Sequence, residues 1–293
     1  MLFPDPSAKP GHARVDPGAT ARSRCFPDGG GGDGEIRCLI EARYEGDAAG
    51  ARTAVDMFAQ SGSIAGLERE QDMDGGFRGR IHLVPELPVG HHARHLGWVA
   101  AASRDFEAFF GELGRRRPSG AAPPSYRWRS IAYRFFRSVG RTTPSAYATG
   151  WTVAYNVSGS LHGSADAVRE TLFHEIFHLN DAARGGWSRV RLGASYDSIV
   201  ARCGTKMPCL APYAPNSTTV RGGTYYAFQP DNGDGVAEYA AELAIRWYRE
   251  HAAVLAGRPP ASPFKCGPAE NARAWQAVVD EFFGGADLVA ACR

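Results

Sequence analysis

The sequence predicts an α+β fold in which a mixed sheet supports a helix that carries the candidate site. Between Trp151 and Val157 every second side chain is large and apolar, which predicts a half-buried strand. Residues 164–184 and 234–256 repeat apolar side chains at three and four residue steps, which predicts two helices. A chain of 293 residues, 44% of them hydrophobic, can bury a full core.

The first predicted helix has recognisable ends. Ser164 is a suitable N-cap, and Asp166 places negative charge in the first turn, where the helix dipole favours it. Gly185 and Gly186 provide a stop. This local pattern predicts that the residues between these signals share regular helical faces.

The motif His174-Glu175-x-x-His178 lies within this helix. Residues four apart on a helix point the same way, so both imidazoles can bind one small cation. Glu175 points about 100° further round, where its carboxylate can act as a general base on a water molecule. The alternative is an ordinary helix that happens to contain two histidines.

A catalytic zinc needs a third protein ligand and one open position. A third histidine six residues after the second is excluded, because position 184 is Arg184, and a glutamate on the second helix remains. We expect Glu238 to bind the metal and Glu242 to accept the free N–H of a zinc-binding histidine. The reverse order and a solvent-facing charged pair are both open. Asp181 is another candidate for the outer role, unless it lies in a solvated helix end.

These two motifs, His174-Glu175-x-x-His178 and a helical Glu238-x-x-x-Glu242, resemble the gluzincin group of zinc metallopeptidases, which includes thermolysin and the anthrax lethal factor protease. The similarity covers roughly residues 125–255. It implies a zincin-like fold and peptide-bond hydrolysis. It also implies one zinc ion per chain, held by His174, His178 and Glu238, with Glu175 as the base.

Two further roles follow from this hypothesis. A strand that precedes the metal helix can form an open edge on which an extended substrate pairs, and we assign part of that edge to Ala154, Tyr155, Asn156 and Val157. An interior strand is the alternative. A tyrosine can donate to the developing oxyanion, and Tyr226 is our candidate, with simple packing as its alternative.

The chain divides by composition into three parts. Residues 1–34 are rich in Pro, Gly and Ala and predict a disordered lead. Residues 35–120 predict an α/β region that starts with a strand at 36–44, and residues 121–293 the catalytic domain. His91 and His95 are also four apart, but they lack an interposed carboxylate and predict a polar loop.

Six cysteines indicate an oxidising compartment. Near neighbours in sequence predict three disulfides, with buried free thiols as the alternative. The expected pairs are Cys25 with Cys38, Cys203 with Cys209, and Cys266 with Cys292. We therefore expect a secreted or periplasmic protein, although no signal-peptide pattern is visible at the start.

The net charge of +2 and the scattered basic residues give no case for nucleic-acid binding, and no apolar run is long enough for a membrane span. We expect a monomer that acts on a peptide or protein substrate. Two other functions stay open. One is a zinc amidase that acts on a cell-wall component or another non-peptide amide, and the other is a catalytically silent zincin-like binding or toxin module.

Overall fold

The computed structural model describes residues 2–3, 17–26, 32–75, 79–117, 119–220, 222–230 and 233–292. Packing divides the chain into two compact units, and we describe each by itself. The first unit contains residues 1–106 and 128–175, and the second contains residues 107–127 and 176–293. This division differs from the expected boundary near residue 120. The chain combines helices with a mixed sheet, which confirms the α+β class.

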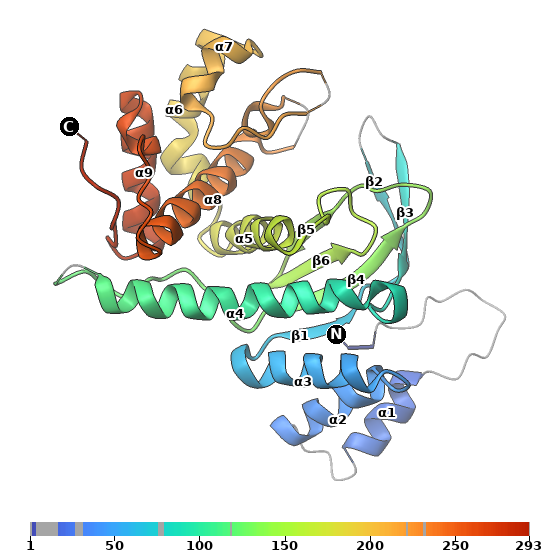
Figure 1. The fold of residues 1–293 in the computed structure, drawn as a ribbon. Helices are drawn as coiled ribbons and strands as arrows, with labels where there is room; N and C mark the ends of the chain where they lie inside the picture. Colours follow the sequence, from blue (N-terminus) through green and yellow to red (C-terminus); the bar gives the residue numbers. More distant parts are fainter. Residues whose placement is uncertain are drawn as a thin grey trace. The chain divides into compact units, whose positions relative to one another are not determined.

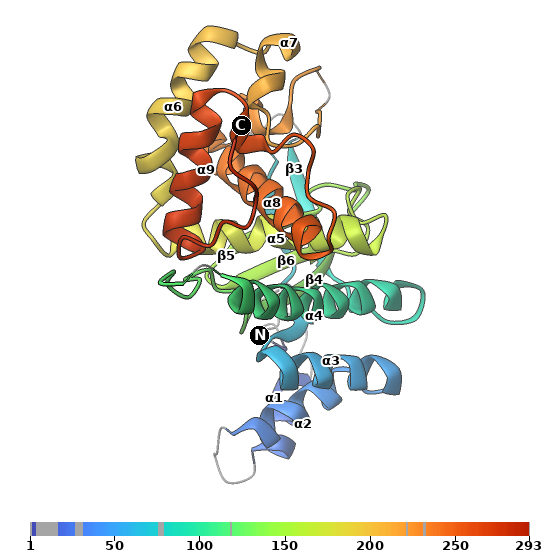
Figure 2. The ribbon, with the colours of Figure 1, turned by 60° about the vertical axis from the view of Figure 1, so that its left-hand side comes forward.

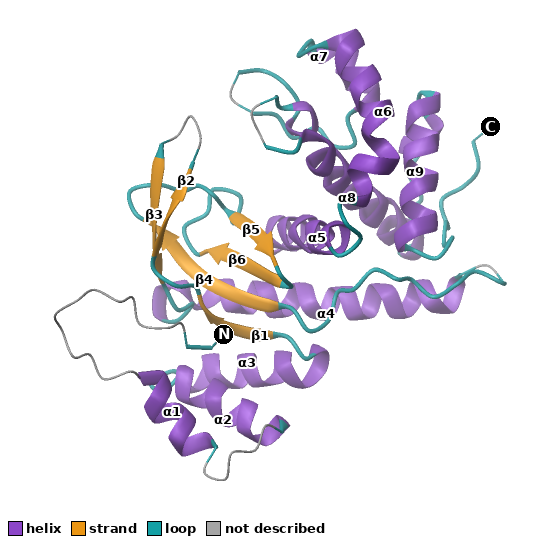
Figure 3. Cartoon of the chain, turned by 180° about the vertical axis from the view of Figure 1, so that it is seen from behind, coloured by secondary structure: helices purple, strands orange, loops and turns teal. Residues whose placement is uncertain are grey.

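The first unit is built on a sheet whose described strands run in the order β2, β3, β4, β6, β5, with β1 also paired to β4 (Figure 3). Strand β4 is parallel to β1 and β6 and antiparallel to β3, so the sheet is mixed. The strands are β1 (Ile64–Leu67), β2 (Gln71–Asp74), β3 (Arg80–Pro85), β4 (Ala132–Ser138), β5 (Ala146–Thr149) and β6 (Thr152–Asn156).

Strand β6 is an interior strand rather than an open edge. It pairs with β4 on one side, where Tyr155 lies opposite Phe135, and with β5 on the other, where Ala154 lies opposite Tyr147. The N–H of Val157 likewise donates to the main-chain oxygen of Phe136 at 2.9 Å. The predicted substrate edge at 154–157 is therefore wrong, because its backbone groups are already paired. All five residues of β6 are buried, so the strand is not half-buried either.

Three helices begin the first unit and lie together at the blue end of the chain in Figure 1. They are α1 (Pro17–Cys25), α2 (Asp33–Arg43) and α3 (Ala48–Ser61). The prediction of disorder is wrong at 17–25, where a disulfide from Cys25 to Cys38 joins α1 to α2. The predicted strand at 36–44 is also wrong, because Ile40 and Tyr44 are buried at the four-residue spacing of a helix. Residues 4–16 and 27–31 of this lead lie outside the described part.

Helix α4 (Ala93–Arg116) follows a short 3-10 helix, η2 (Gly90–His92), and helix α5 (Ala165–Ala182) follows β6. In the second unit α6, α8 and α9 pack against one another (Figure 2). The elements of this unit after α5 are α6 (Trp187–Cys203), α7 (Met207–Leu210), η3 (Ala211–Tyr213), η4 (Tyr226–Phe228), α8 (Gly235–Leu255), η5 (Phe264–Cys266) and α9 (Ala269–Phe282). In its core Trp247 stacks on Phe283, with ring centroids 3.4 Å apart.

The three predicted disulfides are all present. Cys203 at the end of α6 bonds to Cys209 in α7, and Cys266 in η5 bonds to Cys292 near the end of the chain. Three such bonds fit an oxidising, extracellular or periplasmic location.

Within the described part of the chain, no helix combines the length and the apolar character that a membrane crossing needs.

Candidate metal centre

Helix α5 forms for the reasons that the sequence indicated. The N–H of Ala167 donates to the hydroxyl of Ser164 at 3.2 Å, which caps the first turn. Gly185 and Gly186 follow its last turn with φ angles of 69° and 75°, a region that glycine adopts without strain. One face of the helix is fully or almost fully buried through Val168, Leu172, Ile176 and Leu179. This packing anchors the helix that carries His174 and His178.

Helix α8 positions the two candidate glutamates. Asp234 accepts from the N–H of Ala237 at 3.4 Å, as expected of the N-cap. Glu238 lies in the first turn and Glu242 one turn later. Glu242 is only 6% exposed, which excludes the alternative of two glutamates on a solvent-facing surface.

His174, His178 and Glu238 form one group in which a ligand atom from each lies within 4.8 Å of the others. His178 Nε2 is 3.6 Å from Glu238 Oε1. Bonds of 2.0 to 2.1 Å in a tetrahedral arrangement separate two zinc ligands by about 3.3 Å, so this distance suits a shared ion. Two imidazoles and a carboxylate suit zinc and several other transition metals. The three residues therefore fit a metal ion, although their geometry does not identify it.

The three residues of this group differ in their exposure to solvent. His174 is 7% exposed, whereas the side chains of His178 and Glu238 are 20% and 18% exposed. Glu175, the candidate base, directly follows His174 in the sequence and is 9% exposed. The partial exposure of His178 and Glu238 lets solvent reach this group.

The two candidate outer carboxylates have different partners. Asp181 accepts from both the N–H and the hydroxyl of Ser188, each at 2.7 Å, so it fixes the first turn of α6. This bonding favours Glu242 for the outer position, and the role predicted for Asp181 beside a zinc-binding histidine stays a prediction. Glu242 accepts through Oε2 from the side-chain amide of Asn216 at 2.9 Å. Glu242 remains the candidate for the outer position.

Two tyrosines of the second unit are candidates for a hydrogen-bond donor. Tyr226 begins η4, which packs against α8, and its N–H donates to the main-chain oxygen of Thr218 at 2.9 Å. Tyr196 on α6 packs its hydroxyl against Gly235, where any Cβ would clash. Burial raises the pKa of Tyr196, and the charges of Asp197, Asp234 and Glu238 raise it further.

Tyr196 thus lies near Glu238, a candidate metal ligand. No pattern in the sequence indicated this tyrosine. Its segment, residues 187–233, contains no motif, and α6 was not predicted there. The one local signal was Gly235 at the start of α8, where the close approach of another chain segment requires the absence of a side chain.

A second histidine group lies in the first unit, and the sequence did not indicate it. His95 is in α4 rather than in a loop, with 1% exposure, and its Nδ1 is 2.8 Å from the Tyr155 hydroxyl. His162 is 4% exposed, stacks on Tyr155 and donates through Nδ1 to the main-chain oxygen of Asn156 at 2.8 Å. Burial lowers the pKa of each histidine to about 4. Both rings are thus held in the neutral form.

No family model, curated protein or solved structure matches this chain. The functional interpretation therefore depends on the geometry of the metal group and on the chemistry of its residues.

Proposed function

We propose that this protein is a zinc-dependent metallopeptidase with a zincin-like, gluzincin-type catalytic site that hydrolyses peptide bonds. One observation carries the proposal, namely the meeting of His174, His178 and Glu238 ligand atoms within 4.8 Å, with Glu175 next to a ligand in the same helix. A catalytic zinc is commonly held by three protein ligands of these types.

The proposed mechanism assigns the proton transfers to Glu175. When bound, zinc polarises the scissile carbonyl and lowers the pKa of a water molecule. Glu175 takes the proton of that water and later passes it to the leaving amine. A tyrosine hydroxyl stabilises the negative charge on the carbonyl oxygen. We favour Tyr196 over Tyr226 for this role, because the hydroxyl of Tyr196 lies at the start of the helix that carries Glu238.

The substrate needs a place to bind in an extended form. Since β6 is interior, the proposal moves the substrate edge to β5, the last strand in the order of the described sheet. Among the described strands, only β6 pairs with the backbone of Ala146–Thr149, so the other side of β5 can form main-chain hydrogen bonds with a peptide.

The test is hydrolysis of a mixed protein substrate by the zinc-loaded wild type and by Glu175→Gln. The variant keeps the size of the side chain but cannot take a proton, so we expect activity to fall by about 10² to 10⁴-fold while zinc stays bound. Glu170→Gln, a change on the same helix outside the metal group, serves as the matched control and should keep full activity. Full activity in Glu175→Gln, or activity that survives complete removal of metal, would contradict the proposal.

The same assay separates the other functions. Cleavage of cell-wall fragments without cleavage of any protein would indicate an amidase. Stable zinc binding with no hydrolysis in either panel would indicate a silent binding module.

A further inference from the structure

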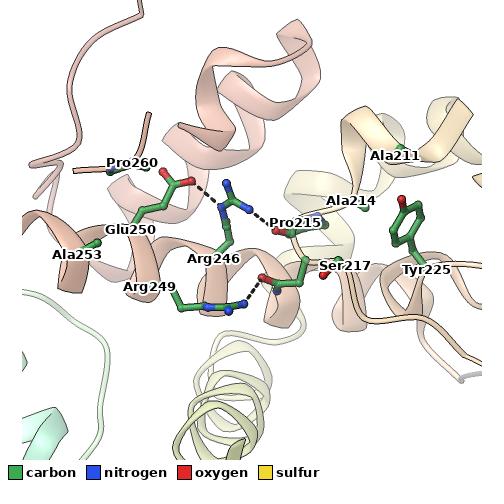
Figure 4. Close-up of a pocket in the computed structure, with 11 residues that line it drawn as sticks. Ala211, Ala214, Pro215, Ser217, Tyr225, Arg246, Arg249, Glu250, Ala253 and Pro260 are labelled. Carbon is green, nitrogen blue, oxygen red and sulfur yellow. Dashed lines mark hydrogen bonds and ion pairs between the residues drawn. The ribbon is translucent and has the colours of Figure 1, made fainter. Parts of the chain in front are cut away.

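A pocket with both charged and apolar lining residues lies in the second unit along α8, beyond the metal ligands. Its volume is about 450 Å³, which is within the range of small-ligand pockets. Arg246, Arg249 and Glu250 of α8 form one wall, and Tyr225 and Pro260 lie among the residues around it (Figure 4). Nothing in the proposed peptidase mechanism uses these residues.

The carboxylate of Glu250 is buried and only partly hydrogen-bonded. It is 4% exposed, and its Oε1 accepts from Arg246 Nε at 2.6 Å and from the N–H of Phe264 at 2.9 Å. Its Oε2 is buried and has no hydrogen-bond partner among the described residues. An unsatisfied buried acceptor of this kind typically costs about 1 to 3 kcal/mol, and more for a charged group. Because Oε2 has almost no exposed surface, a ligand recovers that free energy when the carboxylate turns toward the pocket and accepts the ligand's N–H.

The same wall carries two positive charges. Arg246 Nη1 donates to the main-chain oxygen of Pro215 at 3.3 Å, and Arg249 Nη1 donates to Asn216 Oδ1 at 3.2 Å. With two guanidinium groups and one carboxylate, the wall has a net charge of +1. Guanidinium groups bind carboxylates through paired, charge-assisted hydrogen bonds. The wall therefore favours a ligand with a carboxylate beside an N–H donor.

We propose that this pocket binds the C-terminal residue of a peptide chain. In a chain end the α-carboxylate and the N–H of the same residue are separated by a single carbon atom, which matches neighbouring arginine donors and a carboxylate acceptor. The α-carboxylate binds the guanidinium groups of Arg246 and Arg249, and the N–H donates to Glu250 Oε2. Tyr225 and Pro260 offer apolar surface to the side chain of that residue. The binding does not require the metal.

Three small probes test this by calorimetry on the purified full chain. N-acetyl-phenylalanine carries the chain-end carboxylate, its amide lacks that charge, and N-acetyl-glutamic acid α-amide carries a carboxylate on the side chain only. We expect the first to bind at least about tenfold more tightly than either of the others. Equal binding of the phenylalanine amide would overturn the role of the carboxylate. Equal binding of the glutamic acid amide would overturn the assignment to a chain end.

Variants then locate the binding. Arg249→Gln should weaken binding of N-acetyl-phenylalanine about tenfold, because it removes one charge while glutamine can still donate to Asn216. Arg273→Gln, which changes an exposed arginine on α9 of the same unit, should stay within about twofold of the wild type. Since Arg249 is exposed, its variant is expected to fold, and a thermal melt checks this.

Two results would overturn the assignment of this pocket. One is unchanged binding in Arg249→Gln. The other is loss of probe binding in the presence of a strong chelator, because it would show that the carboxylate binds the metal group instead. Unchanged binding with chelator present supports the pocket and leaves the peptidase proposal to its own assay.

Discussion

Two groups of histidines in the described part of the molecule show how neighbours determine the chemistry of one residue type. In the metal group, His178 is 20% exposed and lies 3.6 Å from the Glu238 carboxylate. In the other group, His95 and His162 are 1% and 4% exposed and contact a tyrosine and a main-chain oxygen. The first group includes a carboxylate that can share a cation with the rings, whereas the rings of the second group pack on Tyr155.

The pKa values of His95 and His162 reflect their burial. Burial is the main cause that lowers the pKa of His95. The charge of Arg94 lowers it further, as do His162 and His92 when they are protonated. Burial also lowers the pKa of His162, although the hydrogen bond to Asn156 acts in the opposite direction. Both imidazoles are therefore neutral at pH 7.

The largest expected difference between the two groups is in zinc affinity. Zinc-binding free energies of about 10 to 16 kcal/mol in small proteins suggest about 3 to 5 kcal/mol for each of three ligands. We therefore expect His178→Ala to weaken zinc binding by at least about 100-fold, and His95→Gln to leave it unchanged. Competition with a chromogenic chelator measures both. Equal losses in the two variants would remove the distinction between the groups.

The next effect is the response of stability to pH. Because the folded pKa of His95 and His162 is about 4 and the unfolded value is about 6.5, the unfolded chain takes up protons first as the pH falls. Stability should decrease from pH 6.5 to pH 4 by up to about 3 kcal/mol for each histidine, and these two groups cause no further loss below pH 4.

Urea unfolding at pH 7.5 and pH 4.5, with chelator present in both, measures this loss. His162→Gln should reduce the pH dependence. His82→Gln, which changes a histidine whose side chain is 42% exposed, should preserve it. A flat stability profile in the wild type would show that the buried histidines do not titrate as described.

A smaller effect is expected beside the metal ligands. Outer groups that orient a ligand typically contribute about 10 to 100-fold in metal affinity. We expect a loss in this range for Glu242→Gln. Asp181→Asn should instead lower the melting temperature without a change in zinc affinity, because Asp181 bonds to Ser188. If Asp181→Asn weakened zinc binding and Glu242→Gln did not, the assignment of the outer carboxylate would be reversed.

The smallest effect concerns the tyrosine of the buried group. Tyr155→Phe leaves His95 Nδ1 without its partner, and we expect a loss of about 1 to 2 kcal/mol in the free energy of unfolding. Tyr239→Phe is the control, since the Tyr239 hydroxyl is buried without a hydrogen-bond partner in the described structure. Its removal should be neutral or slightly stabilising. A loss in Tyr239→Phe as large as in Tyr155→Phe would mean that the measurement reports packing alone.

Local signals were sufficient for part of this molecule. The N-caps Ser164 and Asp234, together with apolar periodicity, predicted α5 and α8, and near neighbours among the cysteines predicted the three disulfides. The choice of Glu238 as a possible third ligand also followed from helix geometry and from the exclusion of Arg184. For the two helices the information lies within the element itself, and the paired cysteines are 6 to 26 positions apart.

Features that depend on distant segments could not be predicted in this way. Alternation in β6 indicates a strand but not that β5 covers its second edge. The meeting of His95 with His162 joins residues 67 positions apart, and no spacing rule connects them. Tyr196 reaches the start of α8 only because α6 packs against it. For residues 36–44 the composition predicted a strand. In the structure residues 33–43 form helix α2, which buries Ile40.

The proposed activity depends most on whether His174, His178 and Glu238 bind one metal ion. X-ray absorption of the zinc-loaded full chain, together with its zinc content, tests this directly. We predict one zinc per chain with two imidazole nitrogens at about 2.0 to 2.1 Å and oxygen in the remaining positions. A protein that takes up no zinc, or a spectrum without imidazole scattering, would contradict the account.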